Sequence, residues 1–119
     1  MNLAAADDET LDVMMRGRVS LLQSRKGYRT SVDAMVLAWF AWTQAPNARR
    51  VADFGAGSGL VAITYGLVSR PAELTLVERQ TSLAERAQRN LALNGVQGTV
   101  LQHDLANGIV PGLAGLDLV

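Results

Sequence analysis

The 119-residue sequence contains no cysteine, which excludes disulfide bridges and thiolate metal sites. This absence fits a reducing compartment, so we expect a cytoplasmic protein. Histidine is almost as scarce: His103 is the only one, and no carboxylate cluster at ligand spacing accompanies it, so the sequence predicts no metal site. No apolar run approaches the roughly 18 residues that a membrane-spanning helix needs, which predicts that the protein has no membrane partner.

Net charge is also absent, because eleven basic residues balance eleven acidic ones. Nothing in the overall charge therefore points to nucleic acid. One local excess of positive charge lies between residues 13 and 32, where no acidic residue interrupts Arg16, Arg18, Arg25, Lys26 and Arg29. This cluster either contacts phosphates or forms the solvated face of a hairpin, and the sequence leaves both interpretations open.

The N-terminal residues are acidic and lack the basic-then-apolar order of a signal peptide. We expect a flexible tail over residues 1–15 and a single domain over residues 16–119. The pattern predicts a hairpin over 18–31 with its turn at Gly27, followed by a helix from Val32 to about Thr43. We expect the apolar residues of this helix to pack into the core: Met35, Val36, Trp39, Phe40 and Trp42.

From residue 49 onward, strand and helix patterns alternate. The predicted order is a strand at 51–54, a helix at 60–68, a strand at 73–78, a helix from a capping box at Ser82 and Glu85 to the stop signal Asn94-Gly95, a strand at 99–102 and the beginning of a strand at 116–119. Such alternation predicts an α/β fold in which helices flank a parallel sheet. Ligands of these sheets bind at the carboxyl ends of the strands, near the point where the strand order reverses.

A glycine loop follows the first of these strands, in the segment Asp53–Gly59. Its three glycines alternate with other residues, which permits a sharp turn and lets a ligand approach the backbone. A dinucleotide site would place the third glycine one residue later, where this sequence has Leu60. Asp53 precedes the first glycine by two residues, and a carboxylate so close disfavours a pyrophosphate and suits a ligand with an ammonium group. A purely structural turn of another α/β protein is the alternative.

Two further acids follow the next two predicted strands. Glu78 lies 23 residues after Gly55, and an acid about 20 residues beyond such a loop typically binds ribose hydroxyls. Asp104 is either an acceptor for an adenine amino group or a helix cap. The three carboxylates together predict a pocket for a cationic nucleoside such as S-adenosylmethionine (SAM). A nicotinamide dinucleotide fits poorly, because its phosphates would meet no basic residue in the loop.

These motifs resemble those of class I SAM-dependent methyltransferases, in the branch that has an Asn-Pro-Pro-Tyr catalytic motif. Asp53–Gly59 is similar to the family's first motif, Glu78 to its ribose-binding acid and Asp104-Leu105 to its adenine-side motif. The resemblance implies a Rossmann-like methyltransferase fold with SAM as cofactor, present here as its N-terminal half only and preceded by a small hairpin and helix. Leu116–Val119 resembles the strand that leads into the catalytic motif, so we expect no catalytic residue within this chain.

The segment Gln23–Phe40 is similar to the N-terminal element of bacterial enzymes that methylate N6 of an adenosine beside the anticodon of tRNA1(Val). In those relatives the element closes over the cofactor. The resemblance therefore implies tRNA, or another nucleic acid, as the partner of the full enzyme. The cofactor-binding residues that it implies are Tyr28, Thr30, Asp33, Asp53, Gly55, Ala56, Gly57, Ser58, Gly59, Glu78, Arg79, Asp104 and Leu105.

Other functions compete with adenine-N6 methylation of tRNA. Within the same branch, the acceptor is alternatively a protein glutamine or an rRNA guanine. A non-catalytic SAM-binding module and a nicotinamide-dependent oxidoreductase are the alternatives from other classes. The last predicted strand would leave an open sheet edge, and such edges pair with other chains, so we also expect self-association.

Overall fold

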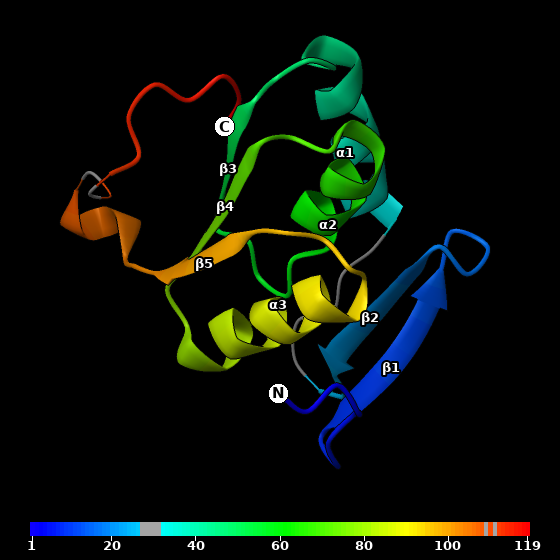
Figure 1. Ribbon diagram of the computed structural model, residues 1–119. Coiled ribbons are helices and arrows are strands. Elements are labelled where there is room, and N and C mark those ends of the chain that lie inside the picture. Colours follow the sequence, from blue (N-terminus) through cyan, green and yellow to red (C-terminus); the bar gives the residue numbers. More distant parts are fainter. Residues whose placement is uncertain (27–31, 109, 111) are drawn as a thin grey trace.

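The computed structural model describes residues 1–26, 32–108, 110 and 112–119, which form an α/β fold with a separate N-terminal hairpin (Figure 1). Its elements are β1 (Glu9–Met14), β2 (Val19–Ser24), α1 (Val32–Gln44), β3 (Arg50–Phe54), α2 (Leu60–Ser69), β4 (Glu73–Glu78), α3 (Thr81–Leu93), β5 (Thr99–Gln102) and the short 3-10 helix η1 (Leu105–Asn107). The predicted α/β architecture is confirmed, and its strands and helices from residue 50 onward lie at or next to their predicted positions.

The main sheet is parallel, with the strand order β3-β4-β5. After η1 the chain returns to the opposite side of β3, where Leu118 forms a parallel bridge with Val51. The Ala52 N–H donates to the Leu118 carbonyl at 3.0 Å. The strand order therefore reverses at β3, which makes the carboxyl end of β3 the switch point of the sheet. The strand predicted at 116–119 appears only as this bridge, and self-association through the edge stays a prediction.

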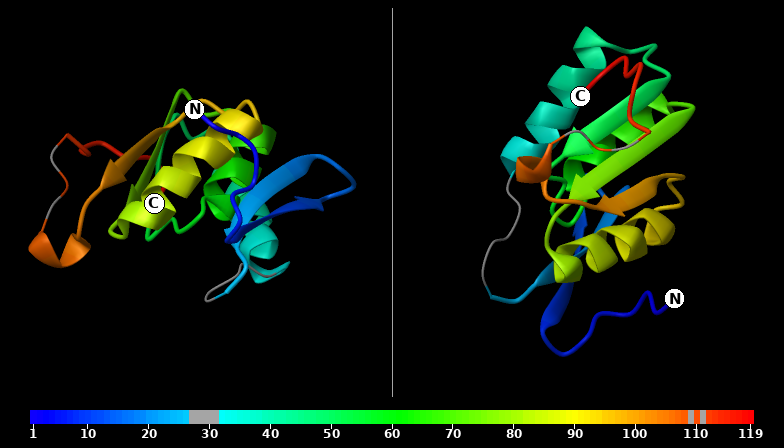
Figure 2. Two further views of the ribbon diagram at one scale, coloured as in Figure 1. Left: turned by 90° about the horizontal axis from the view of Figure 1, so that it is seen from below. Right: turned by 90° about the vertical axis from the view of Figure 1, so that its left-hand side faces the viewer.

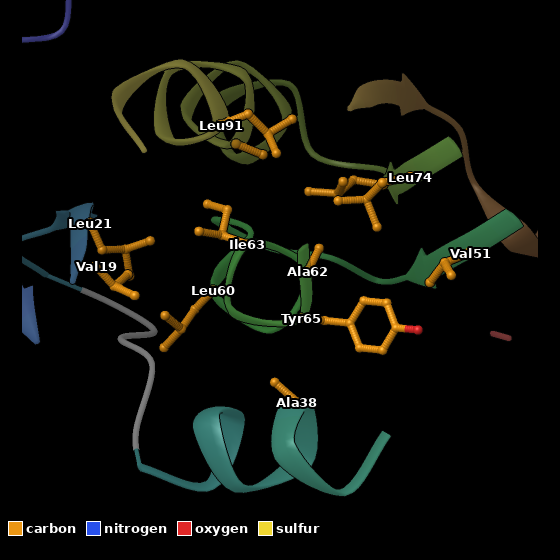
Figure 3. Packing of buried hydrophobic residues seen from close by; sticks show 12 residues of the cluster. Val19, Leu21, Ala38, Val51, Leu60, Ala62, Ile63, Tyr65, Leu74 and Leu91 are labelled. Atoms are coloured by element: carbon orange, nitrogen blue, oxygen red, sulfur yellow. The ribbon is translucent and has the colours of Figure 1, made fainter. Parts of the chain in front are cut away.

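Helices α2 and α3 pack on the sheet, α1 packs on α2, and the hairpin lies beyond α3, away from the sheet (Figure 2). Val19 and Leu21 of β2 point toward Leu60 and Ile63 of α2 (Figure 3). The hairpin thus contributes two fully buried side chains to the same hydrophobic core as the sheet and its helices.

Helix α1 packs into the core less than its sequence predicts. Only Ala38 of this helix is buried, whereas Trp39 and Phe40 are 61% and 53% exposed. Met35 and Trp42 pack partly against the core, and Val36 is exposed. The prediction of core packing is therefore wrong for most of the apolar residues of α1, because this helix contacts mainly one neighbour, α2, and buries one narrow stripe.

The N-terminal region departs most from the sequence-based expectation. Residues 9–14, predicted to belong to a flexible tail, form β1 and pair antiparallel with β2 from Glu9↔Ser24 to Met14↔Val19. The hairpin therefore turns at residues 15–18, whereas the sequence placed the turn at Gly27. Residues 27–31, the second arm of the predicted hairpin, lie outside the described residues. The physical reason is Glu9, which is only 3% exposed and anchors β1 to α3.

The beginning of α3 also differs from its prediction. The helix starts at Thr81 after Gln80, whose side chain makes no capping hydrogen bond, so the capping box at Ser82 and Glu85 is wrong. The Glu78 carboxylate instead accepts the Gln80 N–H at 2.7 Å, and the Thr81 hydroxyl accepts a hydrogen bond from Gln102. Tertiary contacts at the ends of β4 and β5 therefore set the first residue of this helix. Its end is as predicted, with Asn94 as C-cap and Gly95 at φ 65°.

Candidate functional site

The glycine loop at the carboxyl end of β3 is a tight backbone turn. Gly55 and Gly57 adopt φ angles of 76° and 59°, a left-handed conformation that favours glycine. The N–H groups of Gly55 and Ala56 both donate to the Val77 carbonyl, at 2.8 and 3.0 Å, which ties the loop to β4. A Cβ atom at Gly55 or Gly57 would have no neighbour within 4 Å. This side of the loop is therefore open to a ligand.

Gly59 serves a different purpose in the same loop. It precedes α2 with φ 97°, and a Cβ atom there would lie 3.3 Å from Leu76 Cδ2 and 3.4 Å from Ile63 Cδ1. The glycine therefore lets α2 approach β4 closely, while the first two glycines leave the outer side of the loop uncovered.

Glu78 is the acid that the structure brings to this loop. Its side chain, at the end of β4, is 8% exposed. Oε1 accepts the Gly57 N–H at 3.1 Å, and Oε2 accepts the Gln80 N–H at 2.7 Å. The backbone carbonyl of Glu78 accepts the His103 N–H at 3.1 Å, just beyond β5. Glu78 thus joins the glycine loop to the ends of two strands, and each carboxylate oxygen keeps acceptor capacity for a further donor.

Asp53 lies on β3 in register with Leu76, and its Oδ2 is buried without a hydrogen-bond partner among the described residues. It lines a cavity of about 320 Å³ between α1, α2, β3 and Leu118-Val119, and among the described residues no cationic side chain lines this cavity. Burial raises the pKa of Asp53 from 3.8 to about 6. An unpaired buried carboxylate of this kind favours a cationic group beside it.

The remaining predicted residues fall into three groups. Asp104 Oδ1 accepts the Ala106 N–H at 2.9 Å and so caps η1, the alternative that the sequence left open. The side chains of Arg79, Leu105 and Asp33 are exposed, the last of them in the first turn of α1. Tyr28 and Thr30 lie outside the described residues.

The structure therefore assembles part of the predicted acidic pocket. Glu78 contacts the glycine loop directly, and Asp104 follows His103, whose backbone N–H binds Glu78. The cavity beside Asp53 is lined by neither Glu78 nor Asp104, so the three carboxylates do not share one cavity.

Sequence reasoning missed one residue that contacts the loop. Asn90 of α3 is 0% exposed, and its Nδ2 donates to the Ser58 carbonyl at 2.8 Å. One signal was available, because Asn90 stands on the same face of α3 as Ala87 and Leu91, where an apolar residue is expected.

Across the described part of the chain, no helix combines the length and apolar character needed to cross a membrane.

Sequence comparisons relate the chain to methyltransferases. Residues 30–116 match the protein-family model described as "Methyltransferase small domain". A tRNA1(Val) (adenine(37)-N6)-methyltransferase of Shewanella baltica is 42% identical over 64 residues, which cover 54% of this chain and 26% of that protein. A ribosomal RNA large subunit methyltransferase G of Ectopseudomonas mendocina is 46% identical over 46 residues, which cover 39% of this chain and 12% of that protein. The chain spans about a quarter of the length of the first of these relatives.

Solved structures share the fold at low sequence identity. TYW2 of Pyrococcus horikoshii, crystallised with MeSAdo, has a TM-score of 0.70 and 17% identity over 87% of this chain and 39% of its own. The tRNA (uracil-54, C5)-methyltransferase of Pyrococcus abyssi, crystallised with S-adenosyl-L-homocysteine, has a TM-score of 0.71 and 16% identity over 95% of this chain and 28% of its own.

Proposed function

The chain belongs to the methyltransferase small domain family of SAM-dependent methyltransferases, and from this premise we propose that it is the cofactor-binding part of an enzyme that methylates N6 of an adenine in tRNA. The observation that carries the cofactor assignment is the contact between Glu78 and the glycine loop. A buried carboxylate that is already fixed by two backbone N–H groups offers its remaining lone pairs in set directions. Two vicinal ribose hydroxyls are donors that match such a carboxylate.

The residues around the loop also fit the charge of SAM. The ligand carries an ammonium and a sulfonium. Asp53, two residues before the first glycine of the loop, presents a buried oxygen that has no hydrogen-bond partner among the described residues. A cation beside this oxygen would relieve the burial that raises the pKa of Asp53. The open side of Gly55 and Gly57 leaves room for the ligand to approach the backbone.

In this proposal the residues of the chain bind and orient, because SAM itself supplies the reactive methyl group on its sulfonium. Glu78 already holds the glycine loop at the Gly57 N–H, so the loop has its shape before a ligand binds. The same carboxylate would then accept hydrogen bonds from the ribose hydroxyls. In the proposal, Asp53 would hold the amino-acid end of the ligand from its own cavity, which neither Glu78 nor Asp104 lines. Asp104, whose Oδ1 caps η1, would keep its other oxygen for the adenine amino group. The proposed site also includes Ser58, Ala56, Arg79, Leu105 and Asp33. Tyr28 and Thr30, which lie outside the described residues, are proposed as cofactor-binding residues from the family resemblance alone.

The proposed methyl acceptor is supported by the names of the relatives alone. The Shewanella baltica enzyme and others with the same name support an adenine of tRNA, whereas the relative from Ectopseudomonas mendocina supports ribosomal RNA. The gene product that contains these residues would be incubated with methyl-labelled SAM and either tRNA or ribosomal RNA. We expect label in tRNA that is recovered as N6-methyladenosine after nuclease digestion. Label in ribosomal RNA alone would overturn the proposed acceptor and leave the cofactor assignment standing.

The cofactor assignment predicts the behaviour of a Glu78→Ala variant. Loss of the ribose contact and of the loop anchor should weaken S-adenosylhomocysteine binding about tenfold or more, measured by isothermal titration calorimetry. Glu85→Ala is the matched control, since it removes one exposed carboxylate from α3 without touching the loop. Equal affinities of wild type and Glu78→Ala would remove the ribose role, and binding of NAD in place of S-adenosylhomocysteine would revive an oxidoreductase.

A further inference from the structure

Among the described residues, strand β2 is covered on both of its edges, although only one of its neighbours is a strand. One edge pairs with β1, and the other pairs with two side-chain amides of α3. Asn90 Oδ1 accepts the Leu22 N–H at 2.8 Å, and its Nδ2 donates to the Leu22 carbonyl at 3.1 Å. Asn94 repeats this arrangement with the N–H and carbonyl of Ser20, at 2.9 and 2.7 Å.

The spacing of the two asparagines explains why the arrangement works. Four residues of helix rise about 6 Å, and two residues of strand rise about 6.8 Å. Because α3 and β2 run in opposite directions here, a step from Asn90 to Asn94 along the helix matches a step from Leu22 back to Ser20 along the strand. The two amides therefore replace a neighbouring strand on this edge of β2.

The two asparagines differ in the use of their second N–H. Asn94 donates it to the Asn90 carbonyl within α3 at 2.7 Å, whereas Asn90 donates it to the Ser58 carbonyl in the glycine loop at 2.8 Å. Asn90 is fully buried, and its oxygen and both of its amide hydrogens are engaged. It is a residue that contacts the hairpin and the glycine loop through a single rigid amide.

We propose that Asn90 is a positioning residue that sets the shape of the cofactor loop and makes that shape depend on the docked hairpin. The proposal rests on the proposed function, because it takes the glycine loop as the cofactor site. Glu78 holds the loop at the Gly57 N–H, and Asn90 holds it at the carbonyl of the following residue, Ser58. With both contacts in place the peptide groups of the loop are fixed before a ligand binds. Without Asn90, the Ser58 carbonyl is free to rotate and the loop must be ordered by the ligand itself.

The test compares Asn90→Ala with Asn94→Ala. Both variants remove one amide from the edge of β2, but only the first removes a contact with the glycine loop. We expect the amide protons of Gly57 and Gly59 to exchange at least about tenfold faster in ligand-free Asn90→Ala and to stay within about twofold of wild type in Asn94→Ala. The affinity for S-adenosylhomocysteine should fall about five- to tenfold in Asn90→Ala and less than twofold in Asn94→Ala.

A measurement on the wild-type protein tests the proposal even if the Asn90→Ala variant does not fold. Both side-chain amide protons of Asn90 should exchange slowly in nuclear magnetic resonance spectra, and one of them should shift when S-adenosylhomocysteine is added, whereas those of Asn94 should not. The inference would be overturned if the amide protons of Gly57 and Gly59 exchanged at the wild-type rate in folded Asn90→Ala. It would also be overturned if the side-chain amide signals of Asn90 did not shift when S-adenosylhomocysteine binds. If the wild type binds no S-adenosylhomocysteine, the proposed function fails, and faster exchange of Gly57 and Gly59 in Asn90→Ala would still support the mechanical role of Asn90.

Discussion

Replacing Glu9 with alanine should destabilise the fold by about 3–5 kcal/mol, because it leaves a buried guanidinium without its partner. Arg86 Nε lies 2.7 Å from Glu9 Oε2, and the side chains of the two residues are 9% and 3% exposed. Arg89 Nη1 donates to both carboxylate oxygens at 2.9 Å. Urea unfolding at neutral pH measures the loss, with Glu85→Ala as an exposed-acid control. A loss below about 1 kcal/mol would mean that the ion pair is solvated.

The ion pairs of Glu9 also predict how the stability of the fold depends on pH. Burial alone would raise the pKa of Glu9, but hydrogen bonds from Arg86, the Ala6 backbone and Arg89 lower it from 4.5 to about 2. Because this pKa is lower in the folded than in the unfolded chain, the contribution of Glu9 is complete above about pH 4.5 and is lost as the pH falls toward 2. In Glu9→Ala this part of the acid dependence should disappear.

Asp53→Asn should have the opposite effect on stability, raising it by about 1–3 kcal/mol at pH 7.5. Burial raises the pKa of Asp53 from 3.8 to about 6, so the folded chain holds this proton more tightly than the unfolded chain. The contribution of Asp53 to the stability of the wild type therefore falls as the pH rises from about 4 to 6, and the charged carboxylate weakens the fold above that range. The variant lacks this decrease.

Ligand binding separates the two roles of Asp53. If its carboxylate holds the ammonium of SAM, the variant should be more stable than the wild type alone but should gain less when saturating SAM is added. Thermal unfolding between pH 3 and 8, with and without SAM, shows both effects. An Asp53→Asn variant that is less stable at pH 7.5, or that gains as much from SAM as the wild type, would contradict this role.

Most of the elements after residue 50 were predictable because local signals and tertiary packing agree there. The glycines that turn the chain after β3 and the Asn94-Gly95 end of α3 act within a few residues, so a single sequence reveals them. The place of Glu78 beside the loop was predictable for the same reason, since it stands at a strand end at a typical distance from the loop, whereas its role in binding ribose stays a prediction.

The N-terminal third was harder to predict because its contacts are distant in sequence. Glu9 looks like part of an acidic tail until Arg86 and Arg89 are placed beside it. Asn90 looks like a polar residue on the wrong face of an amphipathic helix until β2 is docked there. The composition of α1 was misleading in another way. A helix that is apolar on all sides is predicted to be buried, but only one stripe of α1 packs against α2.

The anchoring of the hairpin to α3 has a consequence for the order of events during synthesis. Residues 9–24 leave the ribosome before any of α3 has been made, and a two-stranded hairpin by itself is at best marginally stable in water. The ribosome adds about 5–20 residues per second, so α3, which binds the hairpin, is synthesised several seconds after the hairpin. During that time its outer strand edge, later occupied by two asparagine amides, is open to any passing chain or chaperone.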